Sequence, residues 1–266
     1  MGFIKKHKKA LVSIGALLIS LALWFSIWWL AALKIGISFI LPSPIEAFAE
    51  FFRLLPQGEF ISAVAGSLFR VISGFLIGVI SGAFVAFLAY FAEPLKVFFA
   101  PFIKIIRATP VASFILICVL WMKTGTVPIF IAFLMVFPIV YENVLTGLRE
   151  TDKGLIEVSR VYGFSPIKAL KKLYIPSALP YFGSASTTSL GLAWKSCVSA
   201  EVLAVCAKSV GYYIYVSKQY FETEQLFAWT IAIVLLSVIL EYAVKGVAHL
   251  IKHCHKKRFG GAVNEK

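Results

Sequence analysis

Long runs of apolar residues, separated by short polar stretches, make up most of the chain. About 20 consecutive apolar residues cross a bilayer as a helix, and six segments are candidates for such spans. They are residues 10–33, 64–91, 111–122, 127–141, 178–206 and 226–248. This pattern predicts an all-α, polytopic integral membrane protein with about six transmembrane helices.

Two of the six segments, 111–122 and 127–141, are short. Prolines stand at their edges or inside them: Pro110, Pro128 and Pro138. Short, interrupted segments persist in a membrane only where protein or a water-filled cavity covers the freed backbone groups. Just before them, we expect residues 94–106 to form a helix along the membrane surface.

The composition supports a membrane protein. Of 266 residues, 60% are hydrophobic and 15% are charged, and the mean hydropathy of +0.87 exceeds what a soluble domain tolerates. The cysteines show no Cys-x-x-Cys spacing, and three of them lie in apolar segments, so we expect reduced packing residues rather than a disulfide framework. The three are Cys118, Cys197 and Cys206, and the fourth cysteine of the chain is Cys254.

The formal net charge of +13 is explained by where the basic residues lie along the chain. Cytoplasmic loops of membrane proteins carry an excess of Lys and Arg, and most of the 26 Lys and Arg residues lie inside if both termini are cytoplasmic. The distribution therefore requires no nucleic acid. Because residues 10–33 lack a convincing small-residue cleavage site, we expect an uncleaved anchor rather than a signal peptide.

The pattern divides the chain into four parts. A basic cytoplasmic N-terminus (1–9) precedes an anchor helix with an external loop (10–63), and a core of spans (64–248) precedes a basic cytoplasmic tail (249–266). The core contains one long cytoplasmic loop, at about residues 142–177, which is amphipathic at helical spacing.

The first half of this loop predicts a short capped helix. In the stretch "DKGLIEVSRVYG", Leu155, Val158 and Tyr162 share one helical face. Gly163 follows at the position where a helix commonly ends with a residue in the left-handed conformation.

The second half predicts another helix after a tight turn. Ser165 and Pro166 supply an N-cap and a first-turn proline, and we expect Pro176 to end the helix. The apolar stripe of this helix includes Ile167. From these residues alone, the loop either lies on anionic headgroups or docks onto a soluble partner.

The spacing in the loop resembles a signature of the permease subunits of bacterial ATP-binding-cassette (ABC) importers. That signature reads Glu-Ala-Ala, three residues, Gly, nine residues and Ile-x-Leu-Pro. The corresponding residues here are Glu157-Val158-Ser159, Gly163 and Leu173-Tyr174-Ile175-Pro176. Glu, Gly and Pro match in register, whereas the alanines and aliphatic residues are replaced by similar ones.

Other stretches look like the nitrate, sulfonate, taurine and bicarbonate branch of this family. They are "LPSPIEAF" from Leu41, "SLFRVISGFLIG" from Ser67, "IRATPVASFILICVLWMKTG" from Ile106, "FPIVYENVLTGLRETDKGLIEVSRVYG" from Phe137 and "LGLAWKSCVSAEVL" from Leu190. The resemblance covers most of the chain, and only the anchor and the tail lack distinctive matches.

The resemblance implies a type I ABC importer permease fold in the bacterial cytoplasmic membrane, with a permease core at 64–248 and coupling helices within 142–177. Its partners would be a cytoplasmic ATPase dimer that binds ATP and Mg, an extracytoplasmic substrate-binding protein and a second, identical permease subunit. The substrate would be a small, anionic solute or a vitamin precursor. The expected coupling residues are Leu155, Glu157, Val158, Ser159, Tyr162, Gly163, Ile167 and Pro176.

Three charged residues lie within the predicted spans. A charge near mid-membrane costs about 2.5–3.5 kcal/mol on insertion scales, so each should face a cavity or a partner. Lys195 and Glu201 are poorly spaced for a pair on one helix. These residues either form structural ion pairs or line the translocation path, and the candidates for the path are Lys195, Glu201, Arg70, Ser186 and Thr187.

Glycines at four-residue spacing, Gly74, Gly78 and Gly82, predict a face that allows close helix approach. The chain has no G-x-x-x-x-G-K-[ST] motif, so ATP must bind to another polypeptide, and no cofactor is expected in this chain. H-E-x-x-H and G-x-S-x-G motifs are also absent, which leaves catalysis without support.

A secondary transporter or channel is the alternative function. It would need internal repeats or paired carboxylates, and only Glu201 lies deep in a span. The tail residues His249, His253, Cys254 and His255 could hold a metal, but a basic cytoplasmic tail is the preferred interpretation, and we expect no metal.

Overall fold

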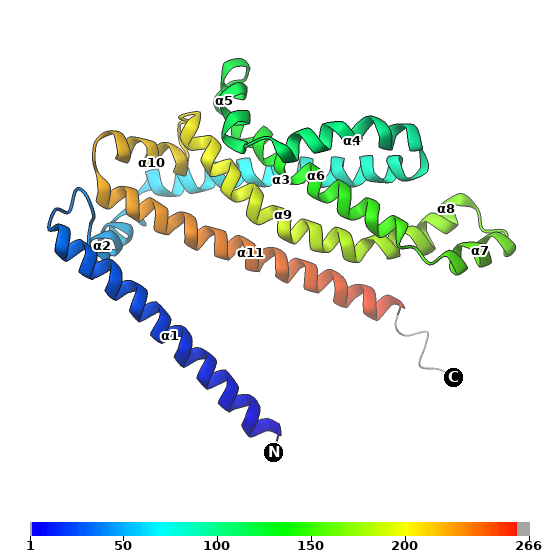
Figure 1. The fold of residues 1–266 in the computed structure, drawn as a ribbon, viewed down its shortest axis with the longest axis horizontal. Coiled ribbons are helices and arrows are strands. Elements are labelled where there is room, and N and C mark those ends of the chain that lie inside the picture. Colours follow the sequence, from blue (N-terminus) through cyan, green and yellow to red (C-terminus); the bar gives the residue numbers. More distant parts are fainter. Residues whose placement is uncertain (1, 260–266) are drawn as a thin grey trace. The chain divides into compact units, whose positions relative to one another are not determined.

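The computed structural model describes the backbone of residues 2–259 and the side chains of residues 15–16, 18–244 and 246. In this part of the chain every regular element is a helix, which confirms the all-α prediction. The chain forms two compact units, Met1–Ile61 with Tyr213–Ala232, and Ser62–Tyr212 with Ile233–Lys266. Figure 1 shows the helices in chain order.

The first unit contains α1 (Gly2–Ile35) and α2 (Pro44–Leu54), with the beginnings of α3 (Gly58–Phe91) and α11 (Thr223–Phe259) and the end of α10 (Val210–Gln219). Aromatic contacts are prominent here. The Trp28 ring stacks on that of Phe227 with 5.5 Å between centroids, and Trp28 Nε1 donates a hydrogen bond to the Pro42 carbonyl oxygen at 3.0 Å.

Helix α2 lies in a segment that was predicted to be an external loop. Its N-terminus is a capping box, in which the Glu46 N–H donates to Ser43 Oγ at 3.3 Å and the Ser43 N–H donates to Glu46 Oε2 at 2.7 Å. The first-turn proline and the Ser-x-x-Glu spacing in "SPIEAF" were the signals that could have predicted this helix.

The second unit contains most of α3 and the helices that follow it. These are α4 (Glu93–Ala108), α5 (Val111–Trp121), α6 (Val127–Arg149), α7 (Lys153–Val161), α8 (Pro166–Ala169), the π-helix η1 (Leu170–Tyr174) and α9 (Ile175–Leu203). Helices α6 and α9 pack along each other over much of their length (Figure 1).

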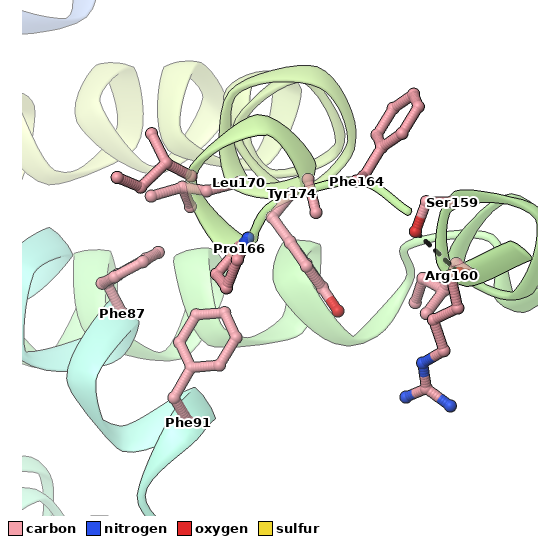
Figure 2. Close-up of a pocket in the computed structure, with 11 residues that line it drawn as sticks. Phe87, Phe91, Ser159, Arg160, Phe164, Pro166, Leu170 and Tyr174 are labelled. Carbon is pink, nitrogen blue, oxygen red and sulfur yellow. Dashed lines mark hydrogen bonds between the residues drawn. The ribbon is translucent and has the colours of Figure 1, made fainter. Parts of the chain in front are cut away.

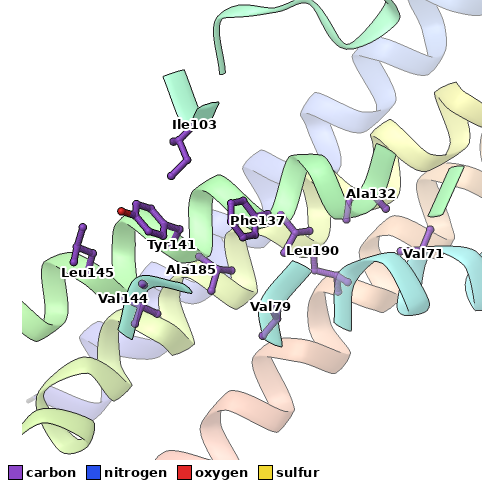
Figure 3. Close-up of a cluster of buried hydrophobic side chains, with 14 of the residues drawn as sticks. Val71, Val79, Ile103, Ala132, Phe137, Tyr141, Val144, Leu145, Ala185 and Leu190 are labelled. Atoms are coloured by element: carbon purple, nitrogen blue, oxygen red, sulfur yellow. The ribbon is translucent and has the colours of Figure 1, made fainter. Parts of the chain in front are cut away.

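The core of the second unit is built from α3, α6 and α9, as Figure 3 shows. Val71, Val140 and Ala193 are fully buried in it. Trp194 is also fully buried, and its Nε1 donates a hydrogen bond to the Ile233 carbonyl oxygen at 3.2 Å. The indole thus fills volume in the core while its one polar atom keeps a partner.

The glycine face of α3 packs directly on α6. A Cβ added at Gly74 would lie 2.4 Å from the Ile129 carbonyl oxygen, and one at Gly78 would lie 2.7 Å from Val136 Cβ. A Cβ at Gly82 would lie 2.9 Å from another α6 carbonyl oxygen. Side chains larger than hydrogen would push the helices apart, so the prediction of close helix packing is confirmed.

The predicted interruption of the segment 127–141 is wrong. Helix α6 runs unbroken from Val127 to Arg149, with Pro138 inside it. Pro138 and Leu134, whose carbonyl lies one turn before the missing N–H, are buried. Because neighbouring helices cover the freed backbone, the proline is tolerated.

The segment 111–122 is short, as expected: α5 has 11 residues. Helix α4 precedes it and covers the expected helix at 94–106, and the two helices are bent by 105° at the Thr109-Pro110 break. The bend follows from the proline, which restricts the residue before it to extended conformations.

By length and hydropathy, four helical stretches within the described residues can cross a membrane, or five if α4 and α5 count as one span. The four are Leu18–Ile35, Gly58–Phe91, Val127–Arg149 and Thr223–Val244. The remaining predicted span corresponds to α9, which has 29 residues and is roughly 43 Å long at 1.5 Å per residue.

Candidate functional site

The segment that connects α6 to α9, residues 150–174, contains the predicted coupling helices, and we call it the coupling segment. It is built from capped helices. Helix α7 begins after Asp152, whose Oδ1 accepts hydrogen bonds from the N–H groups of Gly154 at 2.7 Å and Leu155 at 3.3 Å. It ends before Gly163, which has φ of 63°. The predicted left-handed glycine at the end of this helix is confirmed.

The turn after α7 closes with two backbone hydrogen bonds. The Gly163 N–H donates to the Arg160 carbonyl oxygen at 3.0 Å, and the Phe164 N–H donates to the Ser159 carbonyl oxygen at 2.9 Å. Ser165 then caps α8, because its Oγ accepts from the Lys168 N–H at 3.3 Å. The chain direction is therefore fixed by local hydrogen bonds on both sides of Gly163.

The expectation that Pro176 ends the second helix is wrong. Helix α8 continues through η1 into α9, and Pro176 lies in the first turn of α9. The wider π-helical turn places the Ile175 N–H on the Leu170 carbonyl oxygen, and this shift of the hydrogen-bond pattern accommodates the missing N–H of the next residue. Residues 166–203 thus form one continuous helical rod.

The apolar face of α7 is exposed in the isolated chain. Leu155 and Val158 are each 52% exposed and Tyr162 is 76% exposed. Val161, which is not among the predicted coupling residues, is 85% exposed and adds to this face. Its position next to Val158 and Tyr162 in an amphipathic helix was the available signal. Ile167 of α8 is 66% exposed.

The polar members of the predicted coupling set differ in position. Glu157 is exposed. Ser159 is buried, and its Oγ donates to the Ile156 carbonyl oxygen at 2.7 Å. Ser159 therefore faces the rest of its own chain, and the coupling roles of these residues stay predictions.

A cavity of about 460 Å³ lies behind the coupling segment. Figure 2 shows Phe87 and Phe91 of α3 on one side of it and Arg160 of α7 on the other, with Tyr174 of η1 between them. The ring of Tyr174 packs on that of Phe91, with 5.4 Å between centroids, so the cavity lies between this aromatic contact and α7.

A second group of polar residues surrounds Glu201 near the end of α9. Glu201 is fully buried. Its Oε2 accepts hydrogen bonds from Ser67 Oγ at 2.7 Å and from the Gly211 N–H at 3.3 Å. Arg70 Nη1 lies 3.4 Å from Glu201 Oε1. We call Ser67, Arg70, Glu201 and the main chain of residues 207–211 the Glu201 cluster.

The structure thus brings two of the predicted path residues together, Arg70 and Glu201. Lys195 is exposed, and none of the ion pairs among the described side chains includes it. The hydroxyl groups of Ser186 and Thr187 donate to carbonyl oxygens one turn earlier in α9, at 2.8 and 2.9 Å. A role of these residues in lining the path stays a prediction.

No group of three or more His, Cys, Asp or Glu side chains is arranged to hold a metal in the described residues. The tail residues His249, His253, Cys254 and His255 have side chains outside the described part.

Residues 74–253 match the family described as "Binding-protein-dependent transport system inner membrane component". The chain is 30% identical to a putative aliphatic sulfonates transport permease, SsuC of Escherichia coli K12, over 86% of each chain. It is 24% identical to the taurine transport system permease TauC of the same organism, over 93% of this chain and 91% of that one.

A crystal structure of an amino acid ABC transporter resembles the fold, with a TM-score of 0.63 and 20% identity over 77% of this chain and 97% of that one. The match to the family covers α6, the coupling segment and α9, and so includes Lys195 and Glu201, whereas Ser67 and Arg70 precede it. The chain belongs to the family of binding-protein-dependent transport system inner membrane components, the permease subunits of ABC importers.

Proposed function

We propose that the chain forms the translocation path for a small anionic solute of the aliphatic sulfonate class. Two of the relatives, SsuC and TauC, are named for aliphatic sulfonates and for taurine, which is itself a sulfonate. Lys195 on α9 supplies an exposed cation that would favour an anion in the path.

A separate cytoplasmic ATPase dimer, which binds ATP and Mg, drives this permease through α7 and α8. The observation that carries the proposal is the exposed apolar face of α7 beside the capped turn at Gly163. A short helix with Val161 85% exposed and Tyr162 76% exposed is suited to burial in a groove of a partner protein. Bilayer headgroups are the other possible contact for this face, and the experiment below separates the two.

The coupling segment has the stiffness that transmission requires. Hydrogen bonds from Asp152 and Ser165 cap α7 and α8, and α8 is continuous with α9. A displacement of α8 by the ATPase therefore moves α9 with it as a rigid body, because no flexible loop separates the two helices.

The other partners follow from the family. An extracytoplasmic binding protein delivers the solute, and a second copy of this chain completes the path. With both termini in the cytoplasm, the coupling segment faces the ATPase. The basic residues of the segment 142–177 then lie on the side where membrane proteins concentrate Lys and Arg.

The test is uptake of a radiolabelled alkanesulfonate by proteoliposomes that contain the permease, its ATPase and its binding protein. Val161→Glu should reduce both ATPase association and uptake at least tenfold, because a carboxylate would be buried in an apolar groove. The matched control is Lys153→Gln, an exposed change on the same helix, which should keep wild-type association and uptake.

Equal uptake by Val161→Glu and wild type would refute docking through this face. Retained ATPase association together with a loss of uptake only in proteoliposomes that contain anionic lipid would instead indicate a headgroup contact. Competition by unlabelled sulfonate, but not by nitrate or bicarbonate, supports the substrate class, and the reverse order overturns it.

A further inference from the structure

The loop between α9 and α10, residues 204–209, has a strained backbone. Val205 and Lys208 have φ of 49° and 54°, a region that non-glycine residues rarely adopt, least of all β-branched ones. Such conformations persist only where the surroundings over-determine them, and they are concentrated at active sites and switch regions. The cause of the strain should therefore lie in the side chains that form hydrogen bonds with this loop.

The Glu201 cluster holds it. Arg70 of α3 donates to the carbonyl oxygens of Ala207 at 3.3 Å and Lys208 at 3.4 Å. The Val210 N–H donates to Ser67 Oγ at 3.0 Å, and that hydroxyl in turn donates to Glu201. Side chains of α3 and α9 thus fix both the loop and the first residues of α10.

Two glycines make this close arrangement possible. A Cβ at Gly66 of α3 would lie 2.6 Å from the Lys208 carbonyl oxygen, and one at Gly211 would lie 2.4 Å from Glu201 Cβ. Loop, α3 and α9 are therefore in backbone-level contact here, and a displacement of α9 cannot leave the loop unchanged.

The bonds in the cluster are not equivalent. The Ser67–Glu201 hydrogen bond is 2.7 Å long between two fully buried residues. The three contacts of the Arg70 guanidinium are 3.3–3.4 Å long, and this side chain is 15% exposed. The bond from the Gly211 N–H to Glu201 is also 3.3 Å long, but it is buried. The partly exposed Arg70 contacts are thus the ones that break with the least rearrangement.

Glu201 also lies at one end of the rod that begins at the coupling segment. Residues 166–203 are continuously helical, over roughly 55 Å at 1.5 Å per residue. Ser165 caps the rod where it meets α7, and Glu201 lies in its last turn at the opposite end. A movement imposed on α8 is therefore delivered to the Glu201 cluster.

We propose that Arg70 and Glu201 are positioning residues for transport: movement of the rod breaks the Arg70 contacts and frees loop 204–209, while Ser67 keeps α9 on α3. This inference rests on the proposed function, because an ATPase must move the rod. It assigns the Arg70–Glu201 ion pair to gating of the loop rather than to binding of the solute.

Hydrogen–deuterium exchange of the intact transporter, permease with ATPase, tests this without any substitution. The amides of residues 205–209 are compared in the nucleotide-free state and after trapping with Mg-ATP and vanadate. Trapping should raise their exchange rates at least threefold if the rod frees the loop. Other peptides of the complex should show that the two states differ. If they do and the loop amides exchange at equal rates in both states, the proposal is overturned, because a merely structural cluster would not respond to nucleotide.

Arg70→Gln supplies the second arm. It should raise exchange of the same amides at least threefold without nucleotide, abolish the difference between the two states, and raise basal ATPase activity relative to uptake at least twofold. The control Arg53→Gln removes an arginine from the Glu50–Arg53 pair, which is 2.7 Å long and lies on α2, and should change none of these.

If Arg70→Gln fails to assemble with the ATPase, the comparison of the two nucleotide states in the wild-type transporter still tests the proposal. Wild-type behaviour of an assembled Arg70→Gln transporter would overturn the proposal. Failure of the proposed function gives a different result, since the wild-type complex would then show no vanadate-trapped state and no ATP-driven uptake.

Discussion

Replacement of Gly163 by valine, alanine and asparagine tests whether the turn between α7 and α8 transmits force. Gly163 has φ of 63°, and hydrogen bonds from its own N–H and from that of Phe164 close the end of α7. Valine at this position disfavours the turn, whereas asparagine tolerates the left-handed conformation.

The expected magnitude follows from the surroundings of Gly163. No atom beyond its chain neighbours lies within 4 Å of the position that a Cβ would occupy, so the cost is conformational and not a clash. An L-residue in the left-handed region costs about 1–2 kcal/mol, which changes the ratio of formed to unformed turn roughly 5- to 30-fold. Valine should cost more than alanine because of its branched Cβ.

The assay is the number of solute molecules taken up per ATP hydrolysed in proteoliposomes. Relative to glycine, asparagine should keep most of this ratio, alanine should lower it severalfold, and valine should lower it at least tenfold, while ATP hydrolysis continues. Thermal unfolding of the detergent-solubilised protein should change little, because the turn lies outside the buried core.

Wild-type coupling in Gly163→Val would refute the role of the turn. A loss of coupling in Gly163→Asn as large as that in Gly163→Val would refute the conformational argument, since it would implicate the absence of a side chain rather than the backbone angle.

Three further predictions follow from other parts of the structure. Gly78→Val should destabilise the protein by about 1–3 kcal/mol in thermal unfolding, because its Cβ would meet Val136 at 2.7 Å. Gly183→Val, with open space at that position, should cause no such loss, since valine is no poorer a helix former than glycine; equal losses would contradict the packing of α3 on α6. Lys195→Met should weaken uptake affinity for an anionic solute at least fivefold, and unchanged affinity and rate would remove Lys195 from the path. Hydrogen bonds from the Ser43 N–H and hydroxyl hold the pKa of Glu46 below its ordinary value. The capping box therefore stabilises α2 at neutral pH and loses this contribution as the pH falls through the lowered pKa. Ser43→Ala should raise the titration midpoint of the Glu46 carboxyl group measured by NMR, and an unchanged midpoint would contradict the hydrogen-bonding pattern.

Local signals were sufficient to predict the caps of the coupling segment. The left-handed Gly163 and the Ser165-Pro166 start of α8 depend on a few adjacent residues, and the structure confirms both. The same kind of signal was present in "SPIEAF" but was not used, so α2 was missed. Val161 was missed because only Leu155, Val158 and Tyr162 were assigned to the apolar face of α7, although Val161 lies next to Tyr162 in the sequence.

The effect of the prolines depended on tertiary context. Pro138 and Pro176 do not interrupt their helices, because packing in one case and a π-helical turn in the other accommodate the missing N–H. Arg70 and Glu201 are 131 residues apart, and their pairing depends on how α3 packs beside α9. The sequence identified them as costly charges without showing that they share a bond.

The proposed function depends above all on binding of a separate ATPase to the coupling segment on the cytoplasmic side. The most direct measurement is photo-crosslinking from a benzoyl-phenylalanine placed at Val161, in inverted membrane vesicles that contain the whole transporter. The account predicts a crosslink to the ATPase subunit whose yield changes with Mg-ATP and vanadate. Crosslinks to lipid alone, or to a protein on the extracytoplasmic side, would contradict it.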